Sequence, residues 1–280
     1  MSLLSDKNFQ TRAITGALFV GIVVAGIYLH YYAFLGLLLV INLFCLVEFY
    51  QLTIDKNQVF FIGYSVFTGL LFSTVMAVAP VLSMFDSQLQ KLFLILACAM
   101  FLQMFIQLFY KSEKPFANLG FSFLGIVYIS IPIILLLANS RNFSDDYNPS
   151  FVLLLFMLVW INDTGAYLAG NFFGKTKLFE RISPKKTWEG FIGGLILSMM
   201  VAAPFGKFVL HQSPWLFCGL GLTIGIFSTL GDLIESQLKR SLQIKDSGNF
   251  LPGHGGFLDR FDGFLMAIPA AFFYMAIFAW

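Results

Sequence analysis

The sequence predicts an all-α, polytopic membrane protein with about nine transmembrane helices and a cytoplasmic N-terminus. Of its 280 residues, 58% are hydrophobic and only 11% are charged, whereas about 25% are charged in a typical soluble domain. The apolar residues gather in stretches of about 20 residues, the length that a helix needs to cross a bilayer. Apolarity is continuous within each stretch, which favours helices over the alternating strands of a membrane barrel.

Short polar breaks separate the predicted spans. The breaks contain charged or turn-forming residues, for example at 55–57, 111–114 and 141–149. The predicted spans cover residues 13–29, 32–52, 59–84, 89–110, 117–139, 151–173, 190–208, 214–238 and 264–280. We expect three regions, which are N-terminal transmembrane helices at 1–88, middle helices with dimer contacts at 89–150, and a C-terminal catalytic transmembrane region at 151–280.

The positive charges predict the orientation of these spans. With this alternation of sides, 14 of the 17 Lys and Arg residues fall on the side of the N-terminus, and the others are Lys91, Arg141 and Lys207. Cytoplasmic loops carry the excess of Lys and Arg, so we expect this side in the cytoplasm. The short loops favour a bacterial inner (cytoplasmic) membrane. A net charge of +2 without one basic face argues against a nucleic-acid partner.

Ionisable residues are rare in the first five predicted spans. Glu48, near the cytoplasmic end of the second span, is expected to be an interfacial residue. Two GxxxG spacings occur further along the chain, at Gly170/Gly174 and at Gly221/Gly225, and they predict close packing of helices.

A first polar cluster lies at the end of the sixth predicted span and in the loop that follows. Asn162 and Asp163 stand within the apolar stretch, where a carboxylate is costly unless it faces a cavity or a partner group. An inter-helix hydrogen bond is the alternative reading. The loop at 174–190 contains five cations, which indicates either contact with anionic lipid headgroups or a phosphate clamp. The clamp would consist of Ser183, Lys185, Lys186 and Thr187.

A second cluster begins on the eighth predicted span. Asp232, Glu235, Ser236 and Lys239 have the spacing i, i+3, i+4 and i+7, which places them on one helix face. The loop that follows is rich in glycine, and it ends with Asp259 and Asp262, three residues apart. Carboxylates without cysteines favour a hard cation such as Mg²⁺.

These residues resemble the signature of the phosphatidate cytidylyltransferases, also called CDP-diacylglycerol synthases. The matching pattern reads Ser236-x-x-Lys239-Arg240-x4-Lys245-Asp246-x-Gly248-x3-Pro252-x-His254-Gly255-Gly256-x-x-Asp259-Arg260-x-Asp262. The segments at 162–165 and 183–190 also resemble that family. The resemblance covers about residues 160–263 and implies a homodimeric membrane enzyme that uses CTP and phosphatidic acid. It further implies Mg²⁺, with a monovalent cation such as K⁺ beside it, and Asp232 and Asp259 as metal ligands.

The implied reaction condenses phosphatidic acid with CTP to give CDP-diacylglycerol and pyrophosphate in phospholipid biosynthesis. A phosphate monoester has a second pKa of about 6, so the attacking lipid phosphate is largely ionised and needs no strong base. Catalytic roles are expected for Asp232, Lys239, Arg240, Lys245, His254, Asp259, Arg260 and Asp262. Metal ligands are expected among Asp232, Asp259 and Asp262. Substrate contacts are expected from Asn162, Asp163, Ser183, Lys185, Lys186, Thr187, Ser236, Asp246, Gly255 and Gly256.

Three other functions remain open from the sequence. A CDP-alcohol phosphatidyltransferase is one, because Asp259 and Asp262 begin like the carboxylate motif of that family, although the residues that follow differ from it. A CTP-dependent lipid kinase is another, and it would release CDP instead of pyrophosphate. An ion-coupled transporter would also use intramembrane carboxylates such as Asp163, Asp232 and Glu235, but it would not need a cationic, glycine-rich loop.

Overall fold

The chain forms two compact units in a computed structural model that describes residues 7–78, 86–140, 147–245, 247–248 and 255–279. The first unit comprises Met1–Leu137 together with Ser247–Leu258, and the second comprises Ala138–Asp246 together with Asp259–Trp280. A short segment from late in the sequence therefore belongs to the first unit.

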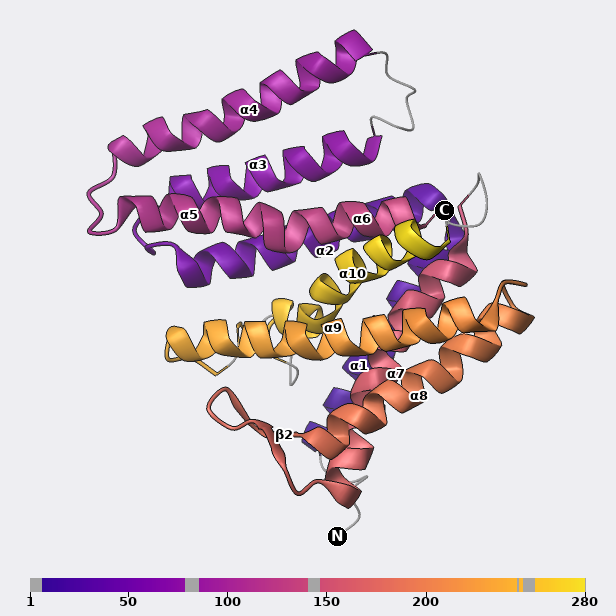
Figure 1. Ribbon diagram of the computed structural model, residues 1–280. Coiled ribbons are helices and arrows are strands. Elements are labelled where there is room, and N and C mark those ends of the chain that lie inside the picture. The colour runs from indigo at the N-terminus through magenta and orange to yellow at the C-terminus, as the bar shows by residue number, and fades with distance from the viewer. Residues whose placement is uncertain (1–6, 79–85, 141–146, 246, 249–254, 280) are drawn as a thin grey trace. The chain divides into compact units, whose positions relative to one another are not determined.

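The first unit contains a series of helices that follow the predicted spans. They are α1 (Lys7–Leu29), α2 (Tyr31–Thr53), α3 (Val59–Val78), α4 (Asp86–Leu108), α5 (Pro115–Gly125), a π-helical turn η2 (Ile126–Ser130) and α6 (Ile131–Asn139). Helix α2 contacts α1 and α3, and α3 contacts α4 (Figure 1). His30 separates α1 from α2 and caps the N-terminus of α2. Its ring nitrogen Nδ1 accepts a hydrogen bond from the main-chain N–H of Tyr32 at 3.2 Å.

The predicted span at 117–139 is interrupted by the π-helical turn. Pro132 lies two residues after the end of this turn, and proline has no N–H to donate to the carbonyl four residues earlier. The widened turn at Ile126–Ser130 accommodates the missing hydrogen bond without ending the helix.

The second unit is a bundle of four helices. They are α7 (Pro149–Phe173), α8 (Trp188–Phe208), α9 (Pro214–Ser241) and α10 (Asp262–Phe278), the last preceded by a 3₁₀ turn, η3 (Leu258–Arg260). Each helix contacts the next one along the chain, and α7 also contacts α9. A Cβ atom on Gly221 would come within 2.8 Å of the Ser198 carbonyl oxygen, which confirms the close packing predicted from the glycine spacing on α9.

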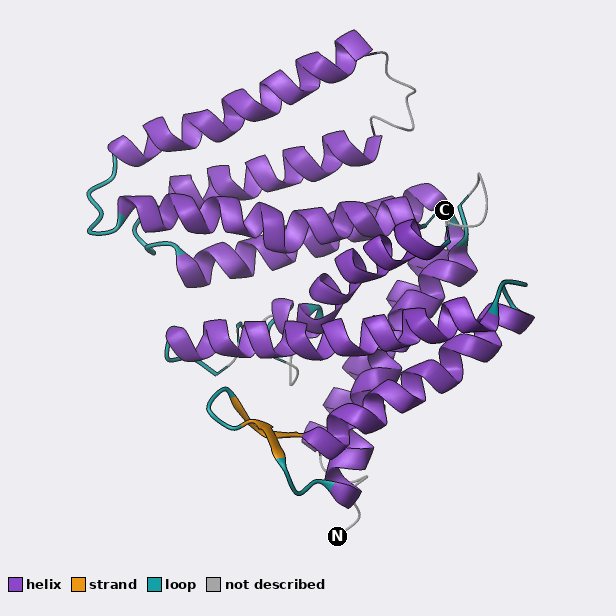
Figure 2. Cartoon of the chain, in the orientation of Figure 1, coloured by secondary structure: helices purple, strands orange, loops and turns teal. Residues whose placement is uncertain are grey.

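The cationic loop between α7 and α8 is a small β-hairpin, which the sequence did not predict. Strand β1 (Lys177–Phe179) pairs antiparallel with β2 (Ser183–Thr187), with Lys177 opposite Thr187 (Figure 2). Strand β2 leads directly into α8, where the Thr187 hydroxyl accepts a hydrogen bond from the Gly190 N–H at 3.1 Å and caps the helix. The hairpin therefore holds its cations in a fixed register above the start of α8.

The helices confirm an all-α, multi-pass membrane protein. Seven described helical segments are long and apolar enough to cross a bilayer. They are Tyr31–Thr53, Val59–Val78, Gln88–Leu108, Pro115–Asn139, Pro149–Phe173, Trp188–Phe208 and Pro214–Ser241. Shorter apolar helices at Thr15–Leu29 and Asp262–Phe278 coincide with the predicted first and ninth spans. The count of nine, the cytoplasmic N-terminus and the division at 88 and 150 stay predictions.

Candidate functional site

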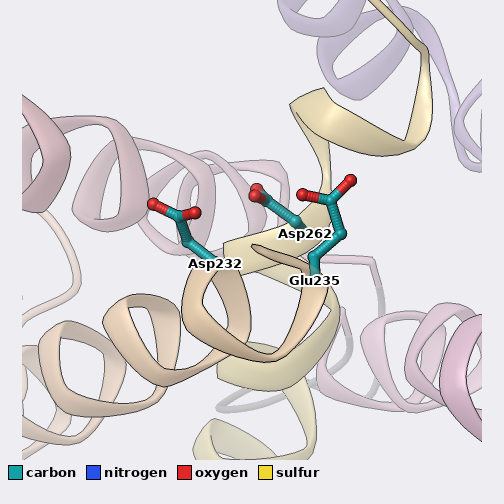
Figure 3. A group of neighbouring side chains, drawn as sticks. All are labelled: Asp232, Glu235 and Asp262. Carbon is teal, nitrogen blue, oxygen red and sulfur yellow. The ribbon is translucent and has the colours of Figure 1, made fainter. Parts of the chain in front are cut away.

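Three carboxylates of the second unit come together where α9 meets the start of α10. Asp232 and Glu235 lie one turn apart on α9, and Asp262 is the first residue of α10. One oxygen from each lies within 4.8 Å of the other two. Figure 3 shows all three carboxylates pointing to the same side of α9. The helical spacing predicted for Asp232 and Glu235 thus brings them together, and the turn before α10 adds Asp262.

Lys239 links this cluster to Asp259. Its ammonium nitrogen lies 2.5 Å from Glu235 Oε2 and donates a hydrogen bond to Asp259 Oδ1 at 2.7 Å. The Glu235 side chain is fully buried, so its charge depends on this ion pair. Ser236 also belongs to this face, since its hydroxyl donates to Asp232 Oδ1 at 3.2 Å. Asp259, predicted as a metal ligand, is paired with Lys239 in this arrangement.

The hairpin supplies a second cation to the same face of α9. Lys186, on β2, forms an ion pair with Asp232 Oδ2 at 2.5 Å and donates to the Thr229 carbonyl oxygen at 3.4 Å. Asp232 is therefore shared between the carboxylate cluster and the hairpin. Both side chains keep some exposure, 25% for Lys186 and 38% for Asp232, so a ligand can reach them.

A pocket of about 310 Å³ opens beside this ion pair. Helices α7, α8 and α9 and the hairpin form its walls, and its charged side chains are Asp163, Lys185, Lys186 and Asp232. Thr187 also lines the pocket, although its side chain mainly caps α8. The intramembrane carboxylate of Asp163 thus faces a cavity, as expected for a charged group at that position.

Asn162 instead joins two helices. It is buried, and its amide nitrogen donates to the hydroxyls of Ser228 at 3.0 Å and Thr229 at 3.3 Å, which fixes α7 against α9. For this residue the alternative reading from the sequence, an inter-helix hydrogen bond, describes the observed contact. Its neighbour Asp163 reaches the pocket because adjacent residues on a helix point about 100° apart.

The remaining predicted residues are not part of this cluster in the described residues. Ser183 begins β2, Arg240 donates to the Ile244 carbonyl oxygen at 3.5 Å on an exposed surface, and Lys245 and Arg260 are exposed. Gly255 and Gly256 belong to the first unit. Asp246 and His254 lie outside the described residues.

The donor set fits a hard divalent cation. Three carboxylate oxygens within 4.8 Å of one another match the oxygen ligands that Mg²⁺ prefers. Glu235 Oε1 is buried and accepts no hydrogen bond from a described residue, so it has coordination capacity left. The sequence placed Glu235 on the polar face but did not name it as a ligand. Its one-turn spacing from Asp232 is the signal that could have identified it.

The arrangement suits the binding of a polyanion next to a metal ion. Lys185 and Lys186 offer positive charge on one wall of the pocket, and the carboxylates of Asp232, Glu235 and Asp262 can hold a cation beside it. Alternating lysines and carboxylates are typical of sites where metal ions and cations together neutralise phosphates.

Comparison with known proteins shows which family the chain belongs to. The sequence profile described as the cytidylyltransferase family matches residues 10–278. A phosphatidate cytidylyltransferase from Bacillus subtilis (strain 168) is 40% identical over 170 residues, which cover 60% of this chain and 62% of that protein. Its counterpart from Staphylococcus aureus (strain COL) is 41% identical over 160 residues, which cover 57% of this chain and 60% of that protein. The chain thus spans about 60% of the length of these curated relatives.

Proposed function

We propose, from the premise that this chain belongs to the cytidylyltransferase family, that it condenses phosphatidic acid with CTP to form CDP-diacylglycerol and pyrophosphate. The relatives from B. subtilis and S. aureus carry the name of this activity. The observation that carries the proposal is the position of Asp232, which lines the lysine-containing pocket and also belongs to the three-carboxylate cluster.

Lys185 and Lys186 are proposed to bind phosphate groups in the pocket. Lys186 is held by Asp232 and by the Thr229 carbonyl oxygen, so its ammonium group is oriented before a substrate arrives. Preorganised cations lower the cost of bringing a triphosphate and a lipid phosphate together, since both are anions. Ser183, Thr187 and the start of α8 lie beside them and could supply further donors.

Asp232, Glu235 and Asp262 are proposed to hold Mg²⁺, with Asp259 as a further candidate through its place beside Lys239. When bound, the cation would neutralise phosphate oxygens of the nucleotide and of the leaving pyrophosphate. Lys239 pairs with both Glu235 and Asp259, which holds these two carboxylates close together. A monovalent cation such as K⁺ is proposed beside the Mg²⁺, from the family resemblance.

No strong general base is needed for the proposed reaction. The phosphate of phosphatidic acid is largely ionised at neutral pH, because its second pKa is about 6. The oxygen of this phosphate would attack the α-phosphorus of CTP, and the bond from that phosphorus to the β-phosphate oxygen would break. The protein's part is to position the two anions and to neutralise their charge.

The proposed setting is the cytoplasmic face of a bacterial inner membrane. The predicted orientation, which rests on the excess of Lys and Arg, puts the hairpin on that face. A water-soluble nucleotide and a lipid held in the bilayer could meet there. A homodimer is also proposed, from the family resemblance, and light scattering of the detergent-purified protein would test it.

The test is an assay of detergent-purified protein with Mg²⁺, phosphatidic acid and CTP labelled in its cytosine. Equal amounts of labelled lipid and released pyrophosphate are expected. Asp232→Asn should abolish both products while the protein stays folded, because it removes one carboxylate charge without a change of size. Lys177→Ala is the matched control, since this hairpin residue is exposed and does not line the pocket.

Other products would contradict the proposal. Release of CDP without labelled lipid would indicate a lipid kinase. Label that stays entirely in CTP, in a protein shown to be folded, would refute nucleotidyl transfer and favour transport, which ion uptake into sealed vesicles would then measure.

A further inference from the structure

Glu48 of the first unit makes three hydrogen bonds to a segment about 200 residues later in the chain. It lies near the C-terminal end of α2. Its Oε1 atom accepts the main-chain N–H of Phe257 at 2.8 Å, and its Oε2 atom accepts the N–H of Leu258 at 2.7 Å. Oε2 also accepts the Ser247 hydroxyl at 3.1 Å. The Glu48 carboxylate thus contacts Ser247, which precedes residues 249–254 in the sequence, and Phe257 and Leu258, which follow them.

Two glycines allow this close approach. A Cβ atom on Gly248 would lie 2.5 Å from Glu48 Oε1, and one on Gly256 would lie 2.8 Å from Oε2. Cβ atoms are essentially never that close to another heavy atom, so a larger residue at either position would displace the carboxylate or the segment. Phe44, one turn earlier on α2, adds an aromatic contact with Phe257 at 5.3 Å between ring centroids.

The donors around Glu48 differ from those around the other carboxylates. The three ion pairs of the described residues involve Lys186 and Lys239, and none of them involves Glu48. Main-chain N–H groups and a hydroxyl stabilise its charge instead, and such charge-assisted hydrogen bonds are stronger than neutral ones. Because both oxygens are directed to the segment, we assign Glu48 a structural contact and not a role as base or metal ligand.

We propose that Glu48 is a positioning residue that anchors Phe257 and Leu258 and thereby sets the position of Asp259, the next residue along the chain. Leu258, whose N–H it holds, is covalently joined to Asp259, and consecutive Cα atoms are about 3.8 Å apart. Asp259 in turn accepts the hydrogen bond from Lys239. The effect on catalysis rests on the function proposed above, whereas the anchoring contact can be measured without it.

Glu48→Gln in the full-length, detergent-purified protein tests the anchor. Glutamine keeps the size of the side chain but turns one acceptor oxygen into an NH₂ group that faces a main-chain N–H. Hydrogen–deuterium exchange of the Phe257 and Leu258 amides should become faster, by about tenfold or more for each lost hydrogen bond. In the CTP assay, kcat should fall by about 10- to 100-fold and the Mg²⁺ concentration for half-maximal rate should rise. The KM for phosphatidic acid should change much less.

Ser73→Ala is the matched control. It removes a buried polar contact of the same unit, in which the Asn42 amide donates to the Ser73 hydroxyl at 2.6 Å, and it does not contact the segment. Its Tm should fall, while exchange at Phe257 and Leu258 and the Mg²⁺ requirement should stay at the wild-type values. A general loss of stability would change the amide exchange and the Mg²⁺ requirement of Glu48→Gln and Ser73→Ala in the same way.

Gly248→Ala disturbs the same contact by adding a Cβ atom next to the Glu48 carboxylate. It provides a second test if Glu48→Gln does not fold. It should reproduce the faster exchange and the lower kcat. The double variant with both Glu48→Gln and Gly248→Ala should lower kcat little more than the more severe single variant. Unchanged amide exchange in both variants would overturn the anchor, and faster exchange with unchanged kcat would overturn its role in positioning. Exchange that depends on Glu48 in a wild-type protein without cytidylyltransferase activity would support the anchor and refute the proposed function.

Discussion

In the first unit, neutral hydroxyls and amides join one helix to another, whereas in the second unit ion pairs between lysines and carboxylates also join α9 to the hairpin and to the turn before α10. The Ser122 hydroxyl lies 2.8 Å from the Ser65 hydroxyl and 2.5 Å from Gln103 Oε1, and the Gln103 amide donates to the Thr68 hydroxyl at 2.5 Å. This network connects α3, α4 and α5. By contrast, the three ion pairs of the described residues all lie in the second unit.

The two kinds of contact have different costs in a membrane protein. Neutral hydrogen bonds between transmembrane helices contribute about 0.6 kcal/mol on average, which is enough to select one packing arrangement. Charged groups at such positions cost several times more, so they are retained mainly where they bind or react. The comparison therefore indicates a packing role for the neutral polar residues of the first unit and a functional role for the charged residues of the second.

The largest expected effect comes from the carboxylate cluster. Asp262→Asn should lower kcat by about 10²- to 10³-fold, because it removes one charge from the proposed cation site. The change in Tm should be small, since asparagine has nearly the same volume. Steady-state kinetics and a thermal melt of the same preparation measure both quantities. Full activity and unchanged Mg²⁺ dependence in Asp262→Asn would contradict the functional role assigned to the charged residues of the second unit.

Asp259→Asn tests whether Asp259 binds the metal ion or only holds Lys239. We expect kcat to fall by a similar factor with folding intact. If Asp259 binds the metal, the Mg²⁺ concentration for half-maximal rate rises, whereas a residue that only holds Lys239 would leave it unchanged. A Mg²⁺ titration of Asp259→Asn beside Asp262→Asn separates the two roles.

A smaller effect is expected for the hairpin. Lys186→Ala should reduce kcat/KM by about 100-fold, because it removes a pocket cation and leaves Asp232 without its ion-pair partner. Lys177→Ala, on the paired strand and outside the pocket lining, should stay within a factor of about two. Equal losses in both variants would mean that the hairpin acts through its overall charge.

The first unit should show the opposite pattern. Ser122→Ala removes the hydroxyl that contacts Ser65 and Gln103 in the buried network, and it should lower the stability by about 1 kcal/mol, or the Tm by about 2–4 °C. The kcat of the folded protein should remain unchanged. A large loss of activity at unchanged Tm would show that the neutral network also takes part in function.

The smallest expected effect is a pH dependence at Asp55, in the break between α2 and α3. Hydrogen bonds from Ser112, at 2.7 Å, and from Asn118, at 3.0 Å, lower the pKa of this carboxyl below its usual value. The ionised group therefore stabilises the folded protein above the unfolded pKa of about 3.9, and this contribution is lost as the pH falls through the lower folded pKa.

Asp55→Asn should accordingly lower the Tm by about 1 °C at pH 7, because the side chain is exposed and its hydrogen bonds compete with water. The difference from wild type should shrink as the pH falls below the folded pKa. Melts of both proteins across the acidic range check this. A difference that grows on acidification would contradict the sign.

The sequence by itself determined the helices and the polar face of α9. Apolar stretches of the length of a bilayer leave the chain few alternatives to helices, because each main-chain polar group must be satisfied within its own segment. Helical periodicity likewise puts Asp232, Glu235 and Lys239 on one face wherever α9 lies. The signature pattern pointed to the family, and the profile match over residues 10–278 confirmed it.

Only the tertiary structure decided which charges meet. The pairing of Lys186 with Asp232 depends on a hairpin that the cationic loop did not reveal, and the pairing of Asp259 with Lys239 depends on the turn before α10. Glu48, expected at the membrane interface, holds a segment about 200 residues away in the sequence. Such contacts follow from how helices pack and loops close over long separations. Local periodicity carries no information about either.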